Sequence, residues 1–252
     1  MPQFSDDLFL GSAQTYMGVN PNNPLNDPSP MDLGVGPVGR IYVWDSVPLT
    51  KGAANIAAAS AYTAAITLTA GTGVTSVLRS DGVTALQVDV PRALSITIGA
   101  GTITNRNVTI TGYDYYGQAM SEVIATGTTQ STTVNGKKAF YQIISASVSG
   151  SVGATVSIGT TDIFGSPVRF ANKGYIARVG WDDTLAEDAA TVVNGVATTA
   201  TTTTGDVRGT VAPSSAADGA KRLVVGILLT AIQAGPNATR AGALGVNQNL
   251  VS

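Results

Sequence analysis

Hydrophobic and polar residues alternate in short segments from residue 38 onward. The alternation is clearest in five segments with aliphatic or aromatic residues at every second position: Gly39–Asp45, Ala65–Thr69, Ala85–Val90, Leu94–Ile98 and Asn107–Thr111. A period of two is typical of a strand with one buried side and one solvent-facing side. Later segments follow the same rule less strictly: Ser121–Ala125, Ala139–Val148, Ala154–Ile158, Tyr175–Trp181, Asp206–Val211 and Arg222–Thr230. The pattern therefore predicts a chain of many short strands.

Turn-forming residues separate these predicted strands. Glycine, asparagine and aspartate fill the gaps, as at Gly71–Gly73, Asp81–Gly82, Gly99–Gly101, Tyr116–Gly117 and Asp218–Gly219. Such residues adopt the backbone conformations that tight turns require. The strands recur roughly every ten residues, with no long helical period between them. We therefore expect an all-β protein whose body is an antiparallel β-sandwich or jelly-roll-like fold.

Two segments fit this pattern less well. Ala53–Ala65 is rich in alanine, the best helix former, but its polar residues and its continuity with the next strand favour strand or loop over a short helix. Thr198–Thr204 is a low-complexity run, for which we expect an exposed loop, with a strand as the alternative.

The N-terminal segment has a different composition from the rest of the chain. Seven of the eleven prolines lie at or before Pro48, together with the asparagine-rich run Asn20–Pro30. Proline fixes φ and removes a backbone donor, so this stretch suits neither a helix nor a central strand. We predict an extended arm over residues 1–37 and a β-sandwich body over residues 38–252, with residues 186–252 completing its sheets.

Charge and hydropathy exclude several classes of partner. Charged residues make up only 12% of the chain, the formal net charge is −2 and the sequence pI is about 5.0. Lysine and arginine are scattered rather than clustered, which disfavours nucleic-acid binding. No apolar run approaches the roughly 18 residues of a membrane span. The first residues lack the pattern of a signal peptide, so we expect assembly in the cytoplasm of a host cell.

The chain contains neither histidine nor cysteine. It therefore lacks the commonest general base, the commonest transition-metal ligand and the thiolate nucleophile. A glycosidase built on two carboxylates would have to use Glu122 or Glu187, the only glutamates, with an aspartate, or else two aspartates. The spacing of these residues in the sequence does not indicate a catalytic pair. We predict a protein that is not an enzyme, with no catalytic residues, no cofactor and no metal site.

Four short motifs have both a chemical and a structural interpretation. Gly34–Gly39 matches GxGxxG but lies between a proline-rich segment and a strand, so we interpret it as turn chemistry. The acidic run 182–188 (Asp182, Asp183, Glu187 and Asp188) favours a solvated loop, with a weak structural calcium site as the alternative. Tyr113–Gly117 favours a hairpin end over a saccharide-binding platform. Lys137–Lys138 suggests a solvated turn.

Two longer pieces carry a family resemblance. Val88–Thr97 reads VDVPRALSIT, and Asn107–Glu122 reads NVTITGYDYYGQAMSE. They resemble a pattern of tailed-bacteriophage virion proteins, in which a strand of the form VPR-a-l-s-I leads to V-T-i-T-G-x-D-x-x-G-x-x-x-S-E. Other pieces similar to the same group follow in order: Lys138–Ser145, Val156–Pro167, Thr204–Thr210 and Ala217–Gly219. The resemblance implies a β-rich head or neck component and supplies no catalytic residues.

The predicted N-terminal arm favours one role among virion proteins, that of a capsid decoration protein. An arm of 37 residues spans up to roughly 120 Å when fully extended, enough to staple adjoining capsid subunits. We expect a decoration (cement) protein on the capsid surface of the virion, binding the major capsid protein and itself, as a homotrimer or homodimer. The alternatives are a tail, neck or fibre-base component, and a carbohydrate-binding host-recognition module that uses Tyr113, Tyr115, Tyr116 and Trp181.

Overall fold

The structure, a computed structural model, describes residues 7–9, 40–170, 172–196 and 205–229. These residues form strands that pair only in antiparallel fashion, and within them the one helical element is the short 3-10 turn η2, Lys173–Tyr175. The predicted all-β, antiparallel sandwich class is therefore confirmed. No helix in the described ranges is long and apolar enough to cross a membrane.

The described residues contain fourteen strands. In chain order they are β1 (Asp7–Phe9), β2 (Arg40–Ser46), β3 (Ala57–Ser60), β4 (Ala65–Ile66), β5 (Val74–Leu78), β6 (Thr84–Ile98), β7 (Asn107–Tyr113), β8 (Ala119–Ala125), β9 (Thr132–Val148), β10 (Val156–Gly165), β11 (Ile176–Trp181), β12 (Thr191–Asn194), β13 (Gly209–Ala212) and β14 (Leu223–Leu229).

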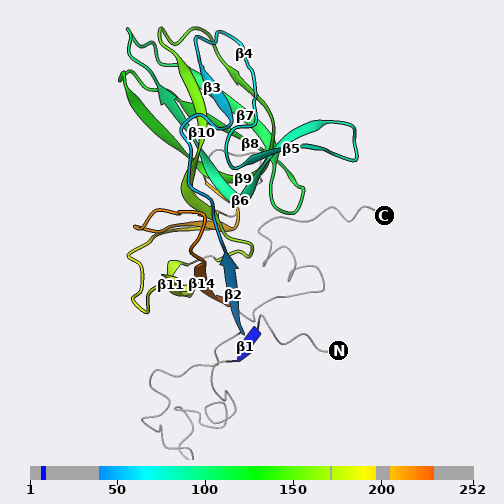
Figure 1. The fold of residues 1–252 in the computed structure, drawn as a ribbon, viewed down its shortest axis with the longest axis vertical. Helices are drawn as coiled ribbons and strands as arrows, with labels where there is room; N and C mark the ends of the chain where they lie inside the picture. The colour runs from blue at the N-terminus through cyan, green and yellow to red at the C-terminus, as the bar shows by residue number, and fades with distance from the viewer. Residues whose placement is uncertain (1–6, 10–39, 171, 197–204, 230–252) are drawn as a thin grey trace, which may run out of the picture.

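The strands form two sheets (Figure 1). The smaller sheet has the order β1-β2-β14-β11. The larger sheet has ten strands, seven of them in the order β12-β13-β10-β6-β9-β7-β8, while β3, β4 and β5 pair at its sides with β10, β9 and β6. The larger sheet is curled, and its two longest strands, β6 with 15 residues and β9 with 17, are neighbours at its centre. Figure 1 shows this curled sheet above the smaller one.

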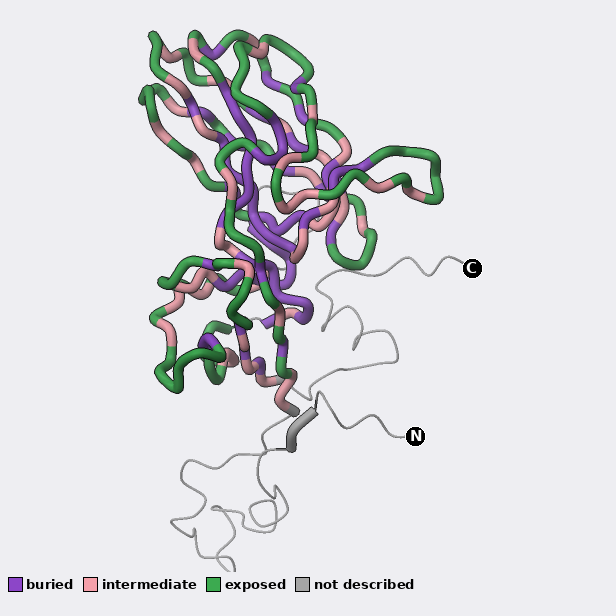
Figure 2. The backbone as a smooth tube through the Cα atoms, viewed as in Figure 1, coloured by how far each residue is buried: buried purple, intermediate pink, exposed green. Residues whose placement is uncertain are grey.

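The described residues form two hydrophobic cores. The first core lies within the curl of the ten-stranded sheet and is built from fully buried aliphatic and aromatic side chains, including Leu94, Ile96, Ile110, Phe140 and Ile158. The second core joins the smaller sheet to one end of the larger sheet, with members that include Trp44, Phe164, Trp181, Val211 and Val225. Figure 2 shows buried backbone running through the middle of the molecule and exposed backbone at the loop tips.

Strand β6 differs from its prediction. The sequence predicts two strands, Ala85–Val90 and Leu94–Ile98, separated at Pro91, whereas the structure has one strand across both. Pro91 lies where the pairing of β6 with β9 shifts register, between Gln87 and Arg92. A bulge leaves a residue out of the hydrogen-bond ladder, so the missing proline N–H costs little there.

Other predicted elements agree in part. Ala53–Ala65 contains β3 and the first residue of β4, which confirms strand or loop over helix. The strand predicted at Ala65–Thr69 is only two residues long, and the sequence pattern missed β5 and β12. Most of the predicted arm, the Gly34–Gly39 motif and the run Thr198–Thr204 lie outside the described residues. Within the arm, β1 pairs with β2.

Candidate functional site

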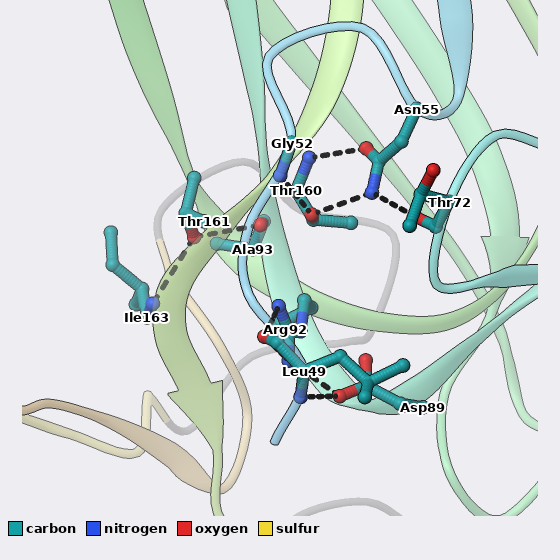
Figure 3. Close-up of polar contacts among 10 residues, drawn as sticks. All are labelled: Leu49, Gly52, Asn55, Thr72, Asp89, Arg92, Ala93, Thr160, Thr161 and Ile163. Atoms are coloured by element: carbon teal, nitrogen blue, oxygen red, sulfur yellow. Dashed lines mark hydrogen bonds and ion pairs between the residues drawn. The ribbon is translucent and has the colours of Figure 1, made fainter. Parts of the chain in front are cut away.

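A buried arginine fastens the segment that leaves β2 to the larger sheet. Arg92 is 1% exposed and donates from Nη1 and Nη2 to the carbonyl oxygen of Leu49, each at 3.1 Å. Asp89 Oδ2 accepts from the Leu49 amide and from Arg92 Nη2, both at 2.6 Å (Figure 3). One ion pair therefore satisfies both backbone groups of Leu49 and fixes where the chain passes between the sheets.

A second set of contacts fastens the same segment a few residues later. Thr160 on β10 donates its amide N–H to the carbonyl oxygen of Gly52 at 2.8 Å and to Asn55 Oδ1 at 3.0 Å. Asn55 Nδ2 in turn donates to Thr160 Oγ1 at 3.0 Å and to the carbonyl oxygen of Thr72 at 3.2 Å (Figure 3). The segment between β2 and β3, called the linker below, is thus held along its length by the two central strands β6 and β10.

Five ionisable side chains lie buried around the β7–β8 hairpin, β9 and the segment before β13. They are Asp114, Glu122, Lys138, Asp206 and Arg208, none more than 4% exposed. Arg208 Nη1 pairs with Asp114 Oδ2 at 2.7 Å. Buried charges are tolerated only when they are paired or hydrogen-bonded, so this cluster depends on its internal contacts.

Two of these carboxylates accept three successive backbone N–H groups of β9. Glu122 accepts from Lys137 N at 2.6 Å and from Lys138 N at 3.3 Å, and Asp206 accepts from Ala139 N at 3.0 Å. The register of β9 against β6 shifts at this point, so the ladder is interrupted. The carboxylates replace the missing strand partner.

The prediction of a solvated turn at Lys137–Lys138 is therefore wrong. Strand β9 continues through both residues, and Lys138 is 1% exposed. Two adjacent lysines look solvent-exposed in the sequence because the acidic residues that interact with Lys138 are distant along the chain. These residues are Glu122 and Asp206.

Burial dominates the electrostatics of this cluster. It raises the pKa of Glu122 and of Asp206, because removing water penalises the charged form, and the backbone hydrogen bonds offset only part of that penalty. Burial also lowers the pKa of Lys138, against the opposing effect of Glu122 and Asp206. The folded state therefore disfavours charge on all three groups.

These shifts predict how stability depends on pH. A carboxyl whose pKa is raised by folding contributes stability that is present below its unfolded pKa, about 4, and lost as pH rises through the folded pKa. The Glu122→Gln variant keeps an oxygen acceptor without the charge, so its free energy of unfolding should fall less as pH rises from 4 toward neutrality. Urea unfolding across this range checks it, with the exposed Glu187→Gln as control. An identical slope in wild type and Glu122→Gln would contradict the prediction.

A cleft of about 350 Å³ lies between the two sheets. Strand β2 forms one wall with Tyr42, Trp44, Asp45 and Ser46, among others. The other wall comes from the larger sheet and its loops: Asp89, Val90, Pro91, Tyr115, Tyr141, Gly165 and Pro167. Its size is within the range of small-molecule sites, and its lining combines aromatic rings with polar oxygens.

The structure does not bring the four predicted saccharide-binding aromatics together in this cleft. Tyr113 lies beneath Arg79, whose guanidinium carbon is 3.6 Å from the ring centroid. The Tyr116 hydroxyl donates to the carbonyl oxygen of Pro167 at 2.7 Å, and Trp181 is 4% exposed within the second core. Of the four, only Tyr115 lines the cleft. Its aromatic neighbours there, Tyr42, Trp44 and Tyr141, carry no local pattern that predicts them.

The acidic run 182–188 lies in a mostly exposed loop, and its three aspartates have separate partners. Asp182 accepts from the Arg222 amide at 2.9 Å, Asp183 pairs with Lys221 at 3.0 Å, and Asp188 accepts the amides of Ser214 and Ser215. Within the described residues no group of three or more acidic side chains could hold a metal ion.

A larger groove, of about 460 Å³, runs beside the linker. Hydroxyl side chains dominate its lining: Ser95, Thr97, Thr133, Thr160, Thr161 and Ser214. Its charged pair, Lys51 and Asp162, forms an ion pair of 3.2 Å. The groove offers polar contacts but neither an aromatic surface nor a reactive arrangement.

Comparison of the chain with family models, with curated proteins and with solved structures gave no match.

Proposed function

We propose that this chain is a structural component of a tailed-phage virion, which binds the outside of the capsid and cements neighbouring capsid subunits. The observation that supports it is that charged residues of the phage-like motifs form buried contacts between segments distant in the sequence. Arg92 of the VPR piece holds the linker, and Asp114 and Glu122 of the longer piece act within the buried cluster. The later pieces supply Lys138 and Arg208 to the same cluster.

These motif residues therefore tie the body together. Their charged groups are directed to backbone amides, backbone carbonyls and each other, at places where segments distant in the sequence meet. A protein that transmits load between subunits needs a body that resists separation of its parts. Buried ion pairs and long paired strands supply such resistance, because breaking one leaves an uncompensated charge or unpaired backbone.

Exposed apolar side chains at two separate places suit a bridging role. Leu78 is 76% exposed on the β5–β6 hairpin, which projects from the larger sheet (Figure 1). Leu185 is 95% exposed in the loop between β11 and β12, beside the smaller sheet. A single exposed leucine does not by itself mark an interface, and we propose that each of these two is covered by a capsid subunit. A cement protein needs at least two such contacts, one for each neighbour.

Substitutions on the β5–β6 hairpin test whether the chain binds and stabilises capsids. Particles assembled with the chain should retain their DNA at higher temperature and through stronger osmotic shock than particles without it. The Leu78→Asp variant should bind capsids at least about tenfold more weakly, because a charge cannot enter an apolar contact without a large desolvation cost. Ser80→Asp, on the same hairpin, is the matched control.

Two outcomes would overturn this proposal. Particles that are equally robust with and without the chain would exclude cementing. A ring of six or twelve copies in solution, measured by native mass spectrometry, would favour the tail or neck alternative over a homotrimer or homodimer on the capsid.

A further inference from the structure

The cleft between the sheets presents rigid aromatic surface. The Tyr115 ring makes edge-to-face contacts with Tyr116 and with Tyr141, each with centroids 5.3 Å apart. Tyr115 is nevertheless 50% exposed, so its ring is fixed by neighbours while much of its surface stays open to the cleft. Trp44 lines the opposite wall. A ring that is already ordered loses little conformational freedom when a ligand packs on it.

Polar groups of the cleft have unused hydrogen-bonding capacity. Ser46 Oγ is buried beneath the cleft wall and has no hydrogen-bond partner among the described residues, so a ligand hydroxyl that bonds it must displace the atoms that cover it. Asp89 uses Oδ2 for Leu49 and Arg92, and its carboxylate, with a side chain 14% exposed, has further lone pairs that can accept hydrogen bonds. Asp89 and Tyr141 line the same cleft. A ligand with several hydroxyl groups would satisfy these positions.

Charge balance selects among possible ligands. The two carboxylates that line the cleft are both compensated: Asp89 pairs with Arg92 at 2.6 Å, and Asp45 pairs with Arg222 at 3.1 Å. Each of these carboxylates is matched by an arginine, so the lining offers no unpaired charge to a cationic or to an anionic ligand. A neutral ligand is favoured. It must combine apolar faces for the rings with hydroxyl groups for Ser46 and Asp89.

We propose that this cleft binds a neutral saccharide, with the Tyr115 ring against a sugar face and Ser46 and Asp89 hydrogen-bonded to its hydroxyls. This activity goes beyond the capsid-binding role and does not depend on it, because Leu78 and Leu185 lie outside the cleft. A virion protein with such a site would hold surface glycans of a cell while remaining attached to the particle.

Ligand-observed NMR of the full chain tests the proposal. The probes are glucose, galactose, mannose, rhamnose and N-acetylglucosamine, with disaccharides of each, at millimolar concentration. At least one should show saturation transfer from the protein and quench tryptophan fluorescence. Tyr115→Ala should weaken binding of that sugar by about tenfold, as expected for loss of one aromatic contact. Ser46→Ala should weaken it by a smaller factor, and Tyr62→Phe, a tyrosine outside the cleft, should leave it unchanged.

Three results would overturn the proposal. The first is the absence of saturation transfer with every sugar of the panel. The second is binding that survives both Tyr115→Ala and Ser46→Ala, which would place the sugar elsewhere. The third is a proline-rich peptide, residues 20–30 of this chain, that binds in a Tyr115-dependent way while no sugar does, which would make the cleft a peptide site. Circular dichroism of each variant separates lost binding from lost folding.

Discussion

The Arg208→Met variant should unfold with a free energy about 3–5 kcal/mol lower than the wild type. Arg208 and its partner Asp114 are each 2% exposed, and the arginine Nη1 lies 2.7 Å from the carboxylate. Methionine removes the positive charge but keeps much of the side-chain volume. Asp114 then becomes a buried carboxylate without its ion pair. The amides of Tyr116 and Gln118 still donate to it, but they carry no positive charge to compensate it.

A second arginine provides the control for this prediction. Arg222 pairs with Asp45 at 3.1 Å, but both side chains are 54% exposed. Exposed ion pairs contribute little because water screens them, so Arg222→Met should cost less than about 1 kcal/mol. Urea unfolding of both variants measures the difference. Equal losses would show that the buried pair has no special role in holding the hairpin to the segment before β13.

The Gly159→Ala variant should lose about 3 kcal/mol or more, at the upper end of the cost of overpacking. A Cβ atom at Gly159 would overlap the carbonyl oxygen of Gly52 and lie 2.5 Å from the carbonyl carbon of Ala53. Both obstacles are backbone, so no side-chain rotation can relieve them. The linker would have to move away from β10 and lose the hydrogen bond from Thr160 N to Gly52 O.

Gly226→Ala is the matched control, because it also lies in a strand. The nearest atoms to a Cβ there are 3.7 Å away or more, which is ordinary van der Waals contact. This substitution should change stability by less than about 1 kcal/mol, in the direction set by reduced freedom of the unfolded chain. Thermal and urea unfolding distinguish the two variants. A Gly159→Ala protein as stable as Gly226→Ala would show that the linker is not held tightly against β10.

The alternation of residues located most of the strands because strand pattern is a local property. Asn107–Thr111 and Ser121–Ala125 were predicted within two residues of β7 and β8, where buried and exposed positions alternate. The pattern failed where burial departs from alternation. In β6, Ala93–Ile96 are all buried, and Pro91 occupies a register shift that only pairing with β9 reveals.

The contacts of the candidate sites could not be predicted from the sequence because they join residues far apart along the chain. Asp114 and Arg208 are separated by 94 positions, and Ala139 and Asp206 by 67. A charged residue gives no local sign of whether it will meet a partner or face water. The pieces Asn107–Glu122, Lys138–Ser145 and Thr204–Thr210 supply members of the buried cluster, but their sequences do not say which residues meet.

The all-β class, the approximate strand positions and the lack of histidine and cysteine side chains can be read from the chain alone, because each is a property of composition or of near neighbours. The folded arrangement was needed to show that Lys138 is buried, that Arg92 and Asn55 fasten the linker, and that Tyr115 and Trp44 line one cleft. Those facts depend on how a long sheet curls and which distant segments it brings together, and no local pattern contains that information.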